Sequence, residues 1–338
     1  MKHLILSAVV LLTPVVAASQ SAAPVIDDIL TGHILPRFEV LAERSRTLAE
    51  TAAAGCTPTS DALRGAYGDA FDAWIAASHL RFGPTEVADR AFALAFWPDS
   101  RGATPRALNT LIAEADPIAA SPEDYAAVSI AARGFYAMEF LLYDDALMAA
   151  GDAEYHCQLV QTVSSDIAAL SSDILSDWQN GYAEKMRTPA PSGLYRSEEE
   201  VLQEAFKALT TGLQFTSDAR LGRPLGTFDR PRPNRAEARR SARSSRHVTL
   251  SLTSLRDLAQ RLAASDAALS ATLTKGFERA LTRLATLEDP VFAGVADPQG
   301  RVRIEVIQQS VDVIRATVRD ELGPTLGVAA GFNALDGD

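Results

Sequence analysis

The sequence predicts an all-α protein organised as two helical bundles. The 338-residue chain is 47% hydrophobic but only 7% aromatic, and its many alanines and leucines favour helices. Apolar residues recur at helical spacing along most of the chain, and no segment has the alternation typical of a strand. The run 188–193, with two prolines and a glycine, interrupts this pattern near the middle. We therefore predict an N-terminal bundle at 23–188 and a C-terminal bundle at 195–338.

Caps and breakers set the predicted helix boundaries. Ser121 and Pro122 suit a helix start, because a hydroxyl caps the first turn and proline needs no donor there. Ser197 and Glu200 have the spacing of a capping box, and Pro36 predicts a kink. The predicted helices are 25–54, 59–80, 104–114, 122–143, 154–186, 197–215, 264–288 and 302–322.

The first 18 residues have the pattern of a secretory signal peptide. A short basic start is followed by an apolar run, Leu4 to Val16, and then by small residues. The run is too short to be a comfortable membrane span, and no later apolar stretch approaches 18 residues. We expect the mature protein to be exported to the periplasm without a transmembrane segment.

Charge and cysteine content narrow the chemistry. The formal charge of −11 argues against nucleic acid as a partner. The two cysteines, Cys56 and Cys157, lie in a chain predicted to enter an oxidising compartment. A disulfide is therefore favoured over a metal site, with two separate buried thiols as the alternative.

The segment 133–143 is the main candidate site. It places one carboxylate, Glu139, in an apolar run, and helical spacing puts Arg133, Tyr136 and Glu139 on one side. A buried carboxylate needs a cation, a metal or several donors. Gly134 weakens a helix, by about 1 kcal/mol relative to alanine. This glycine is consistent with close approach of another backbone or of a ligand.

Residues 217–246 are rich in arginine within an acidic protein. We predict that 221–226 is extended and that Asn234 and Glu237 form a capping box for a further helix. The arginines at 239, 240, 243 and 246 would share that helix with Ser241 and Ser244. One interpretation is a solvated basic face. The alternative is that some arginines turn inward to pair with buried carboxylates such as Glu139 or to hold an anion.

Two further features have alternative interpretations. The loop 96–102 carries Phe96 and Trp97 beside Asp99 and Arg101, so it either covers a pocket and supplies polar groups to it or is a loop pinned by two aromatic rings. His33 lies just before the predicted kink. Alone on an amphipathic helix, it is either a structural residue or a ligand.

Several motifs in order along the mature chain resemble those of the imelysin family. They include His33 to Phe38, Phe96 to Asp99, and Gly134 to Glu139, which aligns with the family's G-x-H-x-x-E motif. Later matches are 221–226, Glu237 with Arg240, Ser241 and Ser244, and the ending 331–338. Imelysins are exported helical proteins once described as peptidases and linked to iron uptake. The resemblance implies two helical domains with a shared pocket near the motif.

The chain departs from the family motif at one position. Tyr136 replaces the motif histidine, and a phenol needs a strongly Lewis-acidic ion such as ferric iron to ionise it. None of the five histidines begins an H-E-x-x-H pair. The sequence therefore favours a binding protein over an enzyme, with a metallopeptidase as the alternative.

The predicted function is binding of a metal ion, an iron complex or a small anion in the interdomain pocket, and the resemblance implies a role in iron uptake. The predicted ligand-binding residues are His33, Asp99, Arg101, Arg133, Tyr136, Glu139, Arg240, Ser241 and Ser244. The predicted metal ligands, for iron or another divalent ion, are Glu139, Tyr136 and His33. A second alternative is a protein-interaction module, in which ion pairs around Glu139 tie the bundles together. An envelope protein is a candidate partner.

Overall fold

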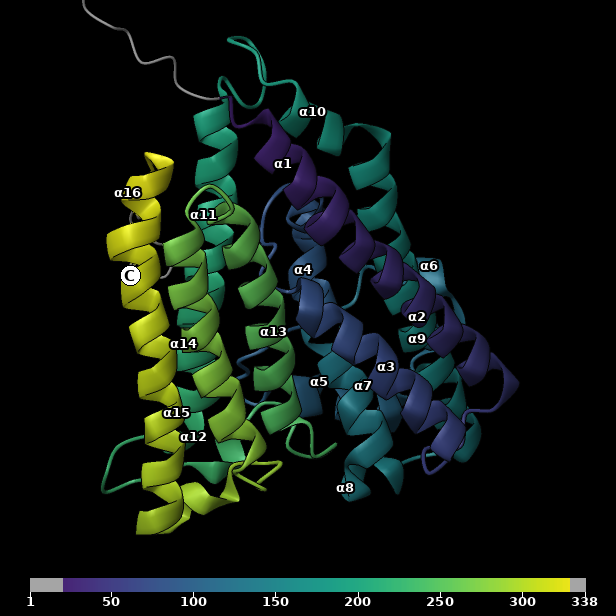
Figure 1. Cartoon of the computed structure of the whole chain (residues 1–338). Helices are drawn as coiled ribbons and strands as arrows, with labels where there is room; N and C mark the ends of the chain where they lie inside the picture. The colour runs from purple at the N-terminus through teal and green to yellow at the C-terminus, as the bar shows by residue number, and fades with distance from the viewer. Residues whose placement is uncertain (1–20, 329–338) are drawn as a thin grey trace, which may run out of the picture.

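A computed structural model describes residues 21–328, and within that range the protein is helical with no strand (Figure 1). The α-helices are α1 Ala23–Ile29, α2 Leu35–Ala54, α3 Asp61–Ala77, α4 Arg90–Leu94, α5 Ala103–Glu114, α6 Pro122–Tyr125, α7 Gly134–Tyr143, α8 Asp145–Met148, α9 Ala153–Asp177, α10 Ala183–Arg187, α11 Glu198–Gln214, α12 Gly222–Leu225, α13 Ser244–Leu262, α14 Ala267–Ala285, α15 Pro298–Thr317 and α16 Gly323–Leu326. Four π-helical segments extend these helices, at Leu30–Ile34, Trp178–Tyr182, Phe215–Leu221 and Val318–Leu322. The predicted signal peptide and the 331–338 motif lie outside the described residues.

The long helices form two groups, as the fold prediction requires. In the first, α2 packs against α3 and α9, and α7 packs against α9. In the second, α13 and α15 both pack against α14 and α11. Figure 1 shows the second group, green to yellow, beside the first. The all-α prediction is confirmed, and residues 188–197 form the non-helical connection between α10 and α11.

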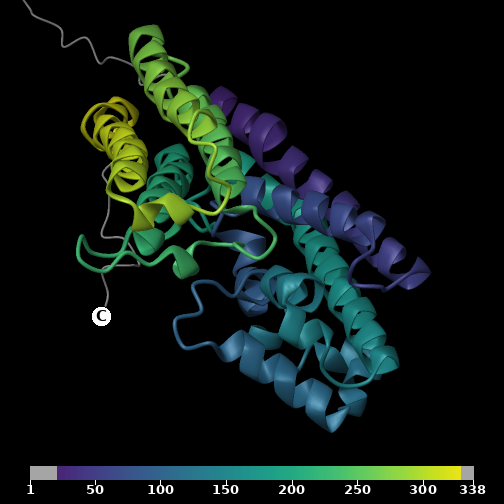
Figure 2. The same ribbon diagram turned by 90° about the horizontal axis from the view of Figure 1, so that it is seen from below.

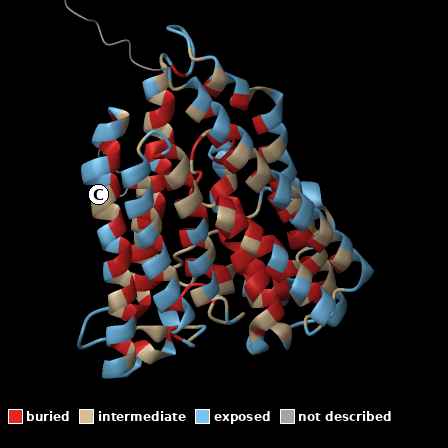
Figure 3. Cartoon of the chain, in the orientation of Figure 1, coloured by how far each residue is buried: buried red, intermediate tan, exposed pale blue. Residues whose placement is uncertain are grey.

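The two groups meet along α3 and α13. Nine of the 17 residues of α3 are buried, including Tyr67, Phe71 and Trp74. A helix buried around most of its circumference lies within a core rather than on a surface. Figure 3 shows the buried residues of this helix between the two groups, with exposed residues on the outer faces. Seen from below, the irregular segment after α12 crosses the junction between the groups (Figure 2).

Most of the predicted long helices are present. The 25–54 helix comprises α1, a π-helical segment and α2, and the predicted kink at Pro36 is replaced by the wide turn at Leu30–Ile34. The 154–186 helix comprises α9, the segment Trp178–Tyr182 and α10. Ser197 caps α11, and its Oγ accepts from the Glu200 amide. None of the described helices is long and apolar enough to cross a membrane.

The predicted helix 122–143 is wrong as a continuous element. It is divided into α6, a 3₁₀ turn at Ile130–Ala132 and α7. The last break is at Gly134, whose φ of +73° is readily adopted only by glycine. A Cβ on Gly134 would lie 2.2 Å from the carbonyl oxygens of Ala93 and Leu94. The expected close approach of another backbone at this glycine is therefore confirmed.

Two expectations for the arginine-rich segment are also wrong. Residues 221–226 are not extended, because α12 includes Pro224 within its first turn, where no amide donor is needed. Residues 236–243 are not helical, since Ala238 and Ala242 have φ values of +46° and +56° and α13 begins only at Ser244. Asn234 and Glu237 form no capping box, because Glu237 is buried among other charged side chains.

The predicted disulfide is confirmed. Cys56 bonds Cys157, with 5.1 Å between the Cα atoms. It joins the end of α2 to the first turns of α9, two elements that are neighbours in the first bundle. It closes a loop of 101 residues, so it restricts the unfolded chain over nearly a third of its length.

Gly134→Ala is expected to lower the free energy of unfolding by about 2–4 kcal/mol, through left-handed strain and overlap with two carbonyl groups. Urea unfolding followed by circular dichroism measures this change. Gly65→Ala is the matched control, because Gly65 is helical and exposed and a Cβ there meets nothing within 4 Å. The control should stabilise the protein by about 0.5–1 kcal/mol. Equal effects of the two substitutions would contradict a special role for Gly134.

Candidate ligand-binding site between the bundles

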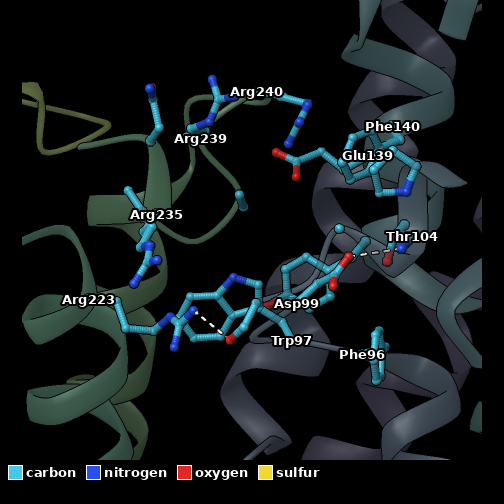
Figure 4. Close-up of a pocket in the computed structure, with 17 residues that line it drawn as sticks. Phe96, Trp97, Asp99, Thr104, Glu139, Phe140, Arg223, Arg235, Arg239 and Arg240 are labelled. Carbon is cyan, nitrogen blue, oxygen red and sulfur yellow. Dashed lines mark hydrogen bonds between the residues drawn. The ribbon is translucent and has the colours of Figure 1, made fainter. Parts of the chain in front are cut away.

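A cavity of about 220 Å³ lies where the two halves of the chain meet. Figure 4 shows its lining, with arginines of the second half facing residues of the first half. The first half contributes Phe96, Trp97, Asp99, Ser100, Gly102, Thr104, Pro105, Tyr136, Glu139 and Phe140, and the second half contributes Arg223, Asn234, Arg235, Ala236, Ala238, Arg239 and Arg240. Four of the predicted ligand-binding residues are in this set, namely Asp99, Tyr136, Glu139 and Arg240.

Glu139 is the carboxylate at the inner wall of the pocket, and its side chain is only 2% exposed. Its Oε1 accepts hydrogen bonds from the Ser241 amide at 2.9 Å and from the Ser241 hydroxyl at 2.8 Å. Burial raises the pKa of Glu139, and the two Ser241 donors and the nearby Arg240 oppose that rise. The charge of Glu139 is therefore stabilised by hydrogen bonds from the second half of the chain, and Glu139 makes no direct ion pair within residues 21–328.

Tyr136 lines the pocket and also belongs to a second, buried cluster. Its hydroxyl donates to Glu237 Oε1, and Arg220 Nε donates to Glu237 Oε2 at 2.8 Å. His247 Nδ1 lies 3.2 Å from the same Oε2. Arg220 also donates to Ser251 Oγ at 3.1 Å. Buried charges are stable when paired and hydrogen-bonded in this way. The cluster therefore joins three elements, namely α7, the π-helical segment Phe215–Leu221 and α13.

The pKa shifts in this cluster follow from burial and charge. Burial alone would raise the pKa of Glu237, but Arg220 and His247 beside it lower that pKa to about 2. Burial, reinforced by the negative charge of Glu237, raises the pKa of Tyr136 well above its ordinary value. Glu237 is therefore a carboxylate, and Tyr136 is a neutral phenol that donates a hydrogen bond to it.

The four pocket arginines differ in their partners. Arg240 bonds Asp144 at 2.9 Å and lies over the Phe140 ring at 3.7 Å, so it spans the two halves. Arg223 lies over Trp97 at 5.6 Å and donates to Ser100, while its buried Nε has no partner.

The remaining two pocket arginines are not paired. Within residues 21–328, the side chains of Arg235 and Arg239 make no hydrogen bond or ion pair. Figure 4 shows both on the arginine-rich side of the pocket. The second half of the chain therefore supplies donors that lack protein acceptors.

The loop before α5 forms the opposite wall. The Trp97–Pro98 peptide bond is cis, and the Trp97 ring stacks on Tyr136 with 6.2 Å between centroids. Asp99 caps α5, since its two carboxylate oxygens accept from the Ala103 amide at 2.9 Å and the Thr104 amide at 2.8 Å. Both interpretations of the 96–102 loop thus apply, because it is held by aromatic packing and also lines a pocket.

His33 lies in a different cluster and does not line the pocket. Its Nδ1 is 2.7 Å from Asp257 Oδ2 and its Nε2 is 2.8 Å from His79 Nε2. Burial lowers the pKa of His33 to about 4, so the ring is neutral near pH 7. With Asp257 accepting from Nδ1–H, His33 Nε2 must accept from His79, which leaves His79 Nδ1 as a bare acceptor. That atom is buried without a partner, in agreement with this assignment.

The other predicted ligand-binding residues lie outside the lining. Arg133 pairs with Asp166 of α9 through two hydrogen bonds, at 2.6 and 2.9 Å, so it does not share a face with Glu139. Arg101 is exposed in its loop. Ser241 holds Glu139, and the buried Ser244 hydroxyl donates to the carbonyl of Glu237. The two serines therefore position residues of the site without lining it.

The predicted metal ligands are not assembled into a metal site. Tyr136 is bonded to Glu237, Glu139 to Ser241, and His33 to Asp257 and His79. Across residues 21–328, no group of three or more His, Cys, Asp or Glu side chains has an arrangement suited to a metal ion. The physical reason is that each predicted ligand already has a protein hydrogen-bond partner, and the phenol is held neutral. These residues do not fit a bare metal ion.

Sequence reasoning missed several site residues. Arg223, Arg235 and Arg239 line the pocket, and Arg220 and Glu237 form its supporting ion pair. The concentration of nine arginines in 217–246 was the available signal, and the inward pairing considered for them is present for Arg220. The pattern did not distinguish which arginines turn inward, because that depends on the irregular path of 236–243.

Fold and site define an all-α protein of two helical bundles with a small polar pocket at their junction. The sequence profile of the family described as Imelysin matches residues 34–318, so the chain belongs to the imelysin family, as the motifs predicted. The crystal structure of an imelysin-like protein from Psychrobacter arcticum 273-4 is similar, with a TM-score of 0.78 and 21% identity, over 94% of this chain and 100% of that one.

A second solved structure is also similar. It is a putative iron-regulated protein A precursor from Parabacteroides distasonis ATCC 8503, with a TM-score of 0.75 and 13% identity, over 91% of this chain and 97% of that one. A search of curated proteins found no match. At these identities the two structures show a shared fold.

Glu237→Gln is expected to lower the free energy of unfolding at pH 7 by about 3–5 kcal/mol, because it leaves the buried Arg220 without its counter-charge. Since the folded-state pKa of Glu237 is below the ordinary 4.5, its stabilising effect is present above pH 4.5 and declines as the pH falls towards about 2. The difference between the wild type and Glu237→Gln should therefore shrink over that range.

Urea unfolding of both proteins at pH 7, 4 and 3 measures this difference. Tyr136→Phe is the matched control, since it removes one hydrogen bond to Glu237 and keeps the ion pair, at a smaller cost of about 1.5–3 kcal/mol. If Glu237→Gln unfolds with the wild-type free energy at pH 7, the ion pair does not stabilise the bundle junction.

Proposed function

We propose that this protein is an exported imelysin-family binding protein that holds a small anion, free or as the anionic part of an iron complex, in the pocket between its bundles. The observation that carries the proposal is the set of four arginines facing a cavity of about 220 Å³. Guanidinium groups bind carboxylate and phosphate oxygens through paired hydrogen bonds. A bare cation would be repelled by the same groups.

The charge balance of the lining favours an anion. Four arginines line the pocket against two carboxylates, Asp99 and Glu139. Asp99 is occupied by two backbone amides of α5, and the Oε1 atom of Glu139 by Ser241. Burial lowers the pKa of Arg223, and the like charge of Arg235 lowers it further. An anion placed among them would relieve this repulsion.

The donors available to a ligand are already in place. Arg235 and Arg239 have no side-chain partner in the described part of the chain, and the buried Nε of Arg223 is unpaired. A buried donor without an acceptor costs about 1–3 kcal/mol, and a ligand oxygen would recover that free energy. Arg235 and Asn234 are exposed, so the anion has access from solvent at this edge.

The pocket volume restricts the ligand to a small molecule. Pockets for drug-sized ligands span about 300–1,000 Å³, and this one is smaller. Peptide substrates extend beyond such a volume. Binding of a small anion is therefore better supported than peptide hydrolysis, which would also require a metal or nucleophile constellation.

Two observations support export and a link to iron. The segment 1–18 has the pattern of a signal peptide, and one similar structure is described as an iron-regulated protein precursor. Hard cations prefer oxygen ligands, which anionic chelating groups supply. An anion site would accept an iron complex of this kind through its outer oxygen atoms.

Arg239→Ala is expected to weaken sulfate binding by about 10–100-fold, through loss of charge-assisted hydrogen bonds. Isothermal titration calorimetry of the mature protein at low ionic strength measures this change. Arg279→Ala is the matched control, because Arg279 is exposed on α14, does not line the pocket and removes the same charge. Equal weakening by both variants would show that only net charge matters. The absence of sulfate binding to the wild type would contradict an anion site.

Sulfate affinity is expected to rise as the pH falls from 8 to 5. Burial raises the pKa of Glu139, and a sulfate ion nearby would raise it further, so binding takes up a proton. Sulfate keeps its charge over this range, and no histidine is among the pocket-lining residues of the described chain. Titrations in buffers of different ionisation enthalpy measure the proton uptake.

Glu139→Gln provides the control for the pH dependence. The substitution removes the titrating carboxyl group and the negative charge that would repel sulfate. The variant should therefore bind sulfate with nearly the same high affinity at pH 8 and pH 5. A wild type whose sulfate affinity is independent of pH would show that Glu139 does not face the bound anion.

A further inference from the structure

Besides its arginine donors, the pocket contains a hydrogen-bond acceptor that faces them, the Glu139 carboxylate. The Ser241 amide and hydroxyl both bond Glu139 Oε1, and no described residue donates a hydrogen bond to Oε2. Oε2 is not one of the fully buried atoms that lack a partner, so it is accessible from the cavity. Since Glu139 lines the cavity, this oxygen faces the ligand space, as the carboxylate group does in Figure 4.

A ligand that fills this pocket must therefore both accept and donate. Its acidic groups accept from Arg235 and Arg239, and a separate donor is needed at Glu139, because an anionic group there would face another negative charge. An ammonium group would supply a donor but would be repelled by the four arginines around it. A hydroxyl group donates a hydrogen bond without carrying charge.

Two aromatic residues of the pocket, Trp97 and Phe140, already have protein groups against their rings. Trp97 has Arg223 over its face at 5.6 Å and stacks on Tyr136 with 6.2 Å between the ring centroids. Phe140 has Arg240 over its face at 3.7 Å. An aromatic ligand would therefore compete with these protein groups for the faces of Trp97 and Phe140. The cavity of about 220 Å³ also limits the ligand to few atoms.

We infer that the ligand class is a small aliphatic hydroxycarboxylate, bound by its carboxylates at Arg235 and Arg239 and by its hydroxyl at Glu139. This inference rests on the proposed anion site and adds a requirement for the hydroxyl. Sites that bond a substrate hydroxyl discriminate strongly against the analogue that lacks it, because the protein group is then left unpaired.

Three four-carbon dicarboxylates test the inference, since they differ only at one carbon. Malate carries a hydroxyl there, aspartate an ammonium group and succinate a hydrogen. Isothermal titration of the mature protein at pH 8, with both enantiomers of malate and aspartate, gives the affinities. We expect the affinity for the better malate enantiomer to be at least about tenfold higher than the affinities for succinate and aspartate.

Glu139→Gln shows whether this residue is responsible. Because Ser241 donates to one oxygen, the new amide would direct its NH₂ group towards the ligand, as a donor. Succinate should then bind more tightly than it does to the wild type, and the ratio of malate to succinate affinity should fall to within about threefold. Glu278→Gln, an exposed change on α14 with the same loss of charge, should leave the ratio unchanged.

The outcomes separate this inference from the proposed function. If sulfate, succinate and malate all fail to bind, the anion site itself is wrong. If succinate binds as tightly as malate, the anion site stands and the hydroxyl requirement is overturned. Tighter binding of aspartate than of malate would show that Glu139 takes a cationic donor, which also overturns the inference. A malate preference that persists in Glu139→Gln would place the hydroxyl elsewhere.

Discussion

The ion pair of Glu237 with Arg220 is the interaction on which the junction between the bundles depends. Both side chains are almost completely buried, and such a pair is stable only when its remaining donors and acceptors are also satisfied. Tyr136 from the first bundle and Ser251 from α13 meet that requirement. The pair therefore holds α7 against the second bundle, and it positions the backbone that leads to Ser241.

That backbone shapes the pocket. Residues 236–243 leave the helical conformation, with two alanines in the left-handed region, and this irregular path presents the Ser241 amide to Glu139. A helix over the same residues would have used that amide in its own hydrogen bonds. Arg239 lies on this segment and Arg235 directly before it, and neither side chain has a partner among residues 21–328. One stretch of chain thus both donates hydrogen bonds to the buried Glu139 and presents arginine side chains to a ligand.

Local sequence signals predicted the helices but not the site. Caps, prolines and apolar spacing located most of the long helices of both bundles, and Glu139 was identified as a buried carboxylate from the apolar residues around it. The grouping of Arg133 with Glu139 failed because it assumed one continuous helix, which Gly134 interrupts. His33 was assigned to the pocket, but it bonds Asp257, which is 224 residues away. The arginines were noticed as a cluster without their individual directions.

The sequence alone determined the helical class, the two-bundle organisation and the family, because these depend on composition, periodicity and motifs that are local or in fixed order. It favoured the disulfide between Cys56 and Cys157, which the structure confirms. The tertiary structure decided which partner each charged side chain has. Glu139 and Ser241 are 102 residues apart, and Tyr136 and Glu237 are 101 apart. Such pairings depend on how the two bundles dock, and buried charge is satisfied by whichever groups that docking brings within hydrogen-bonding distance.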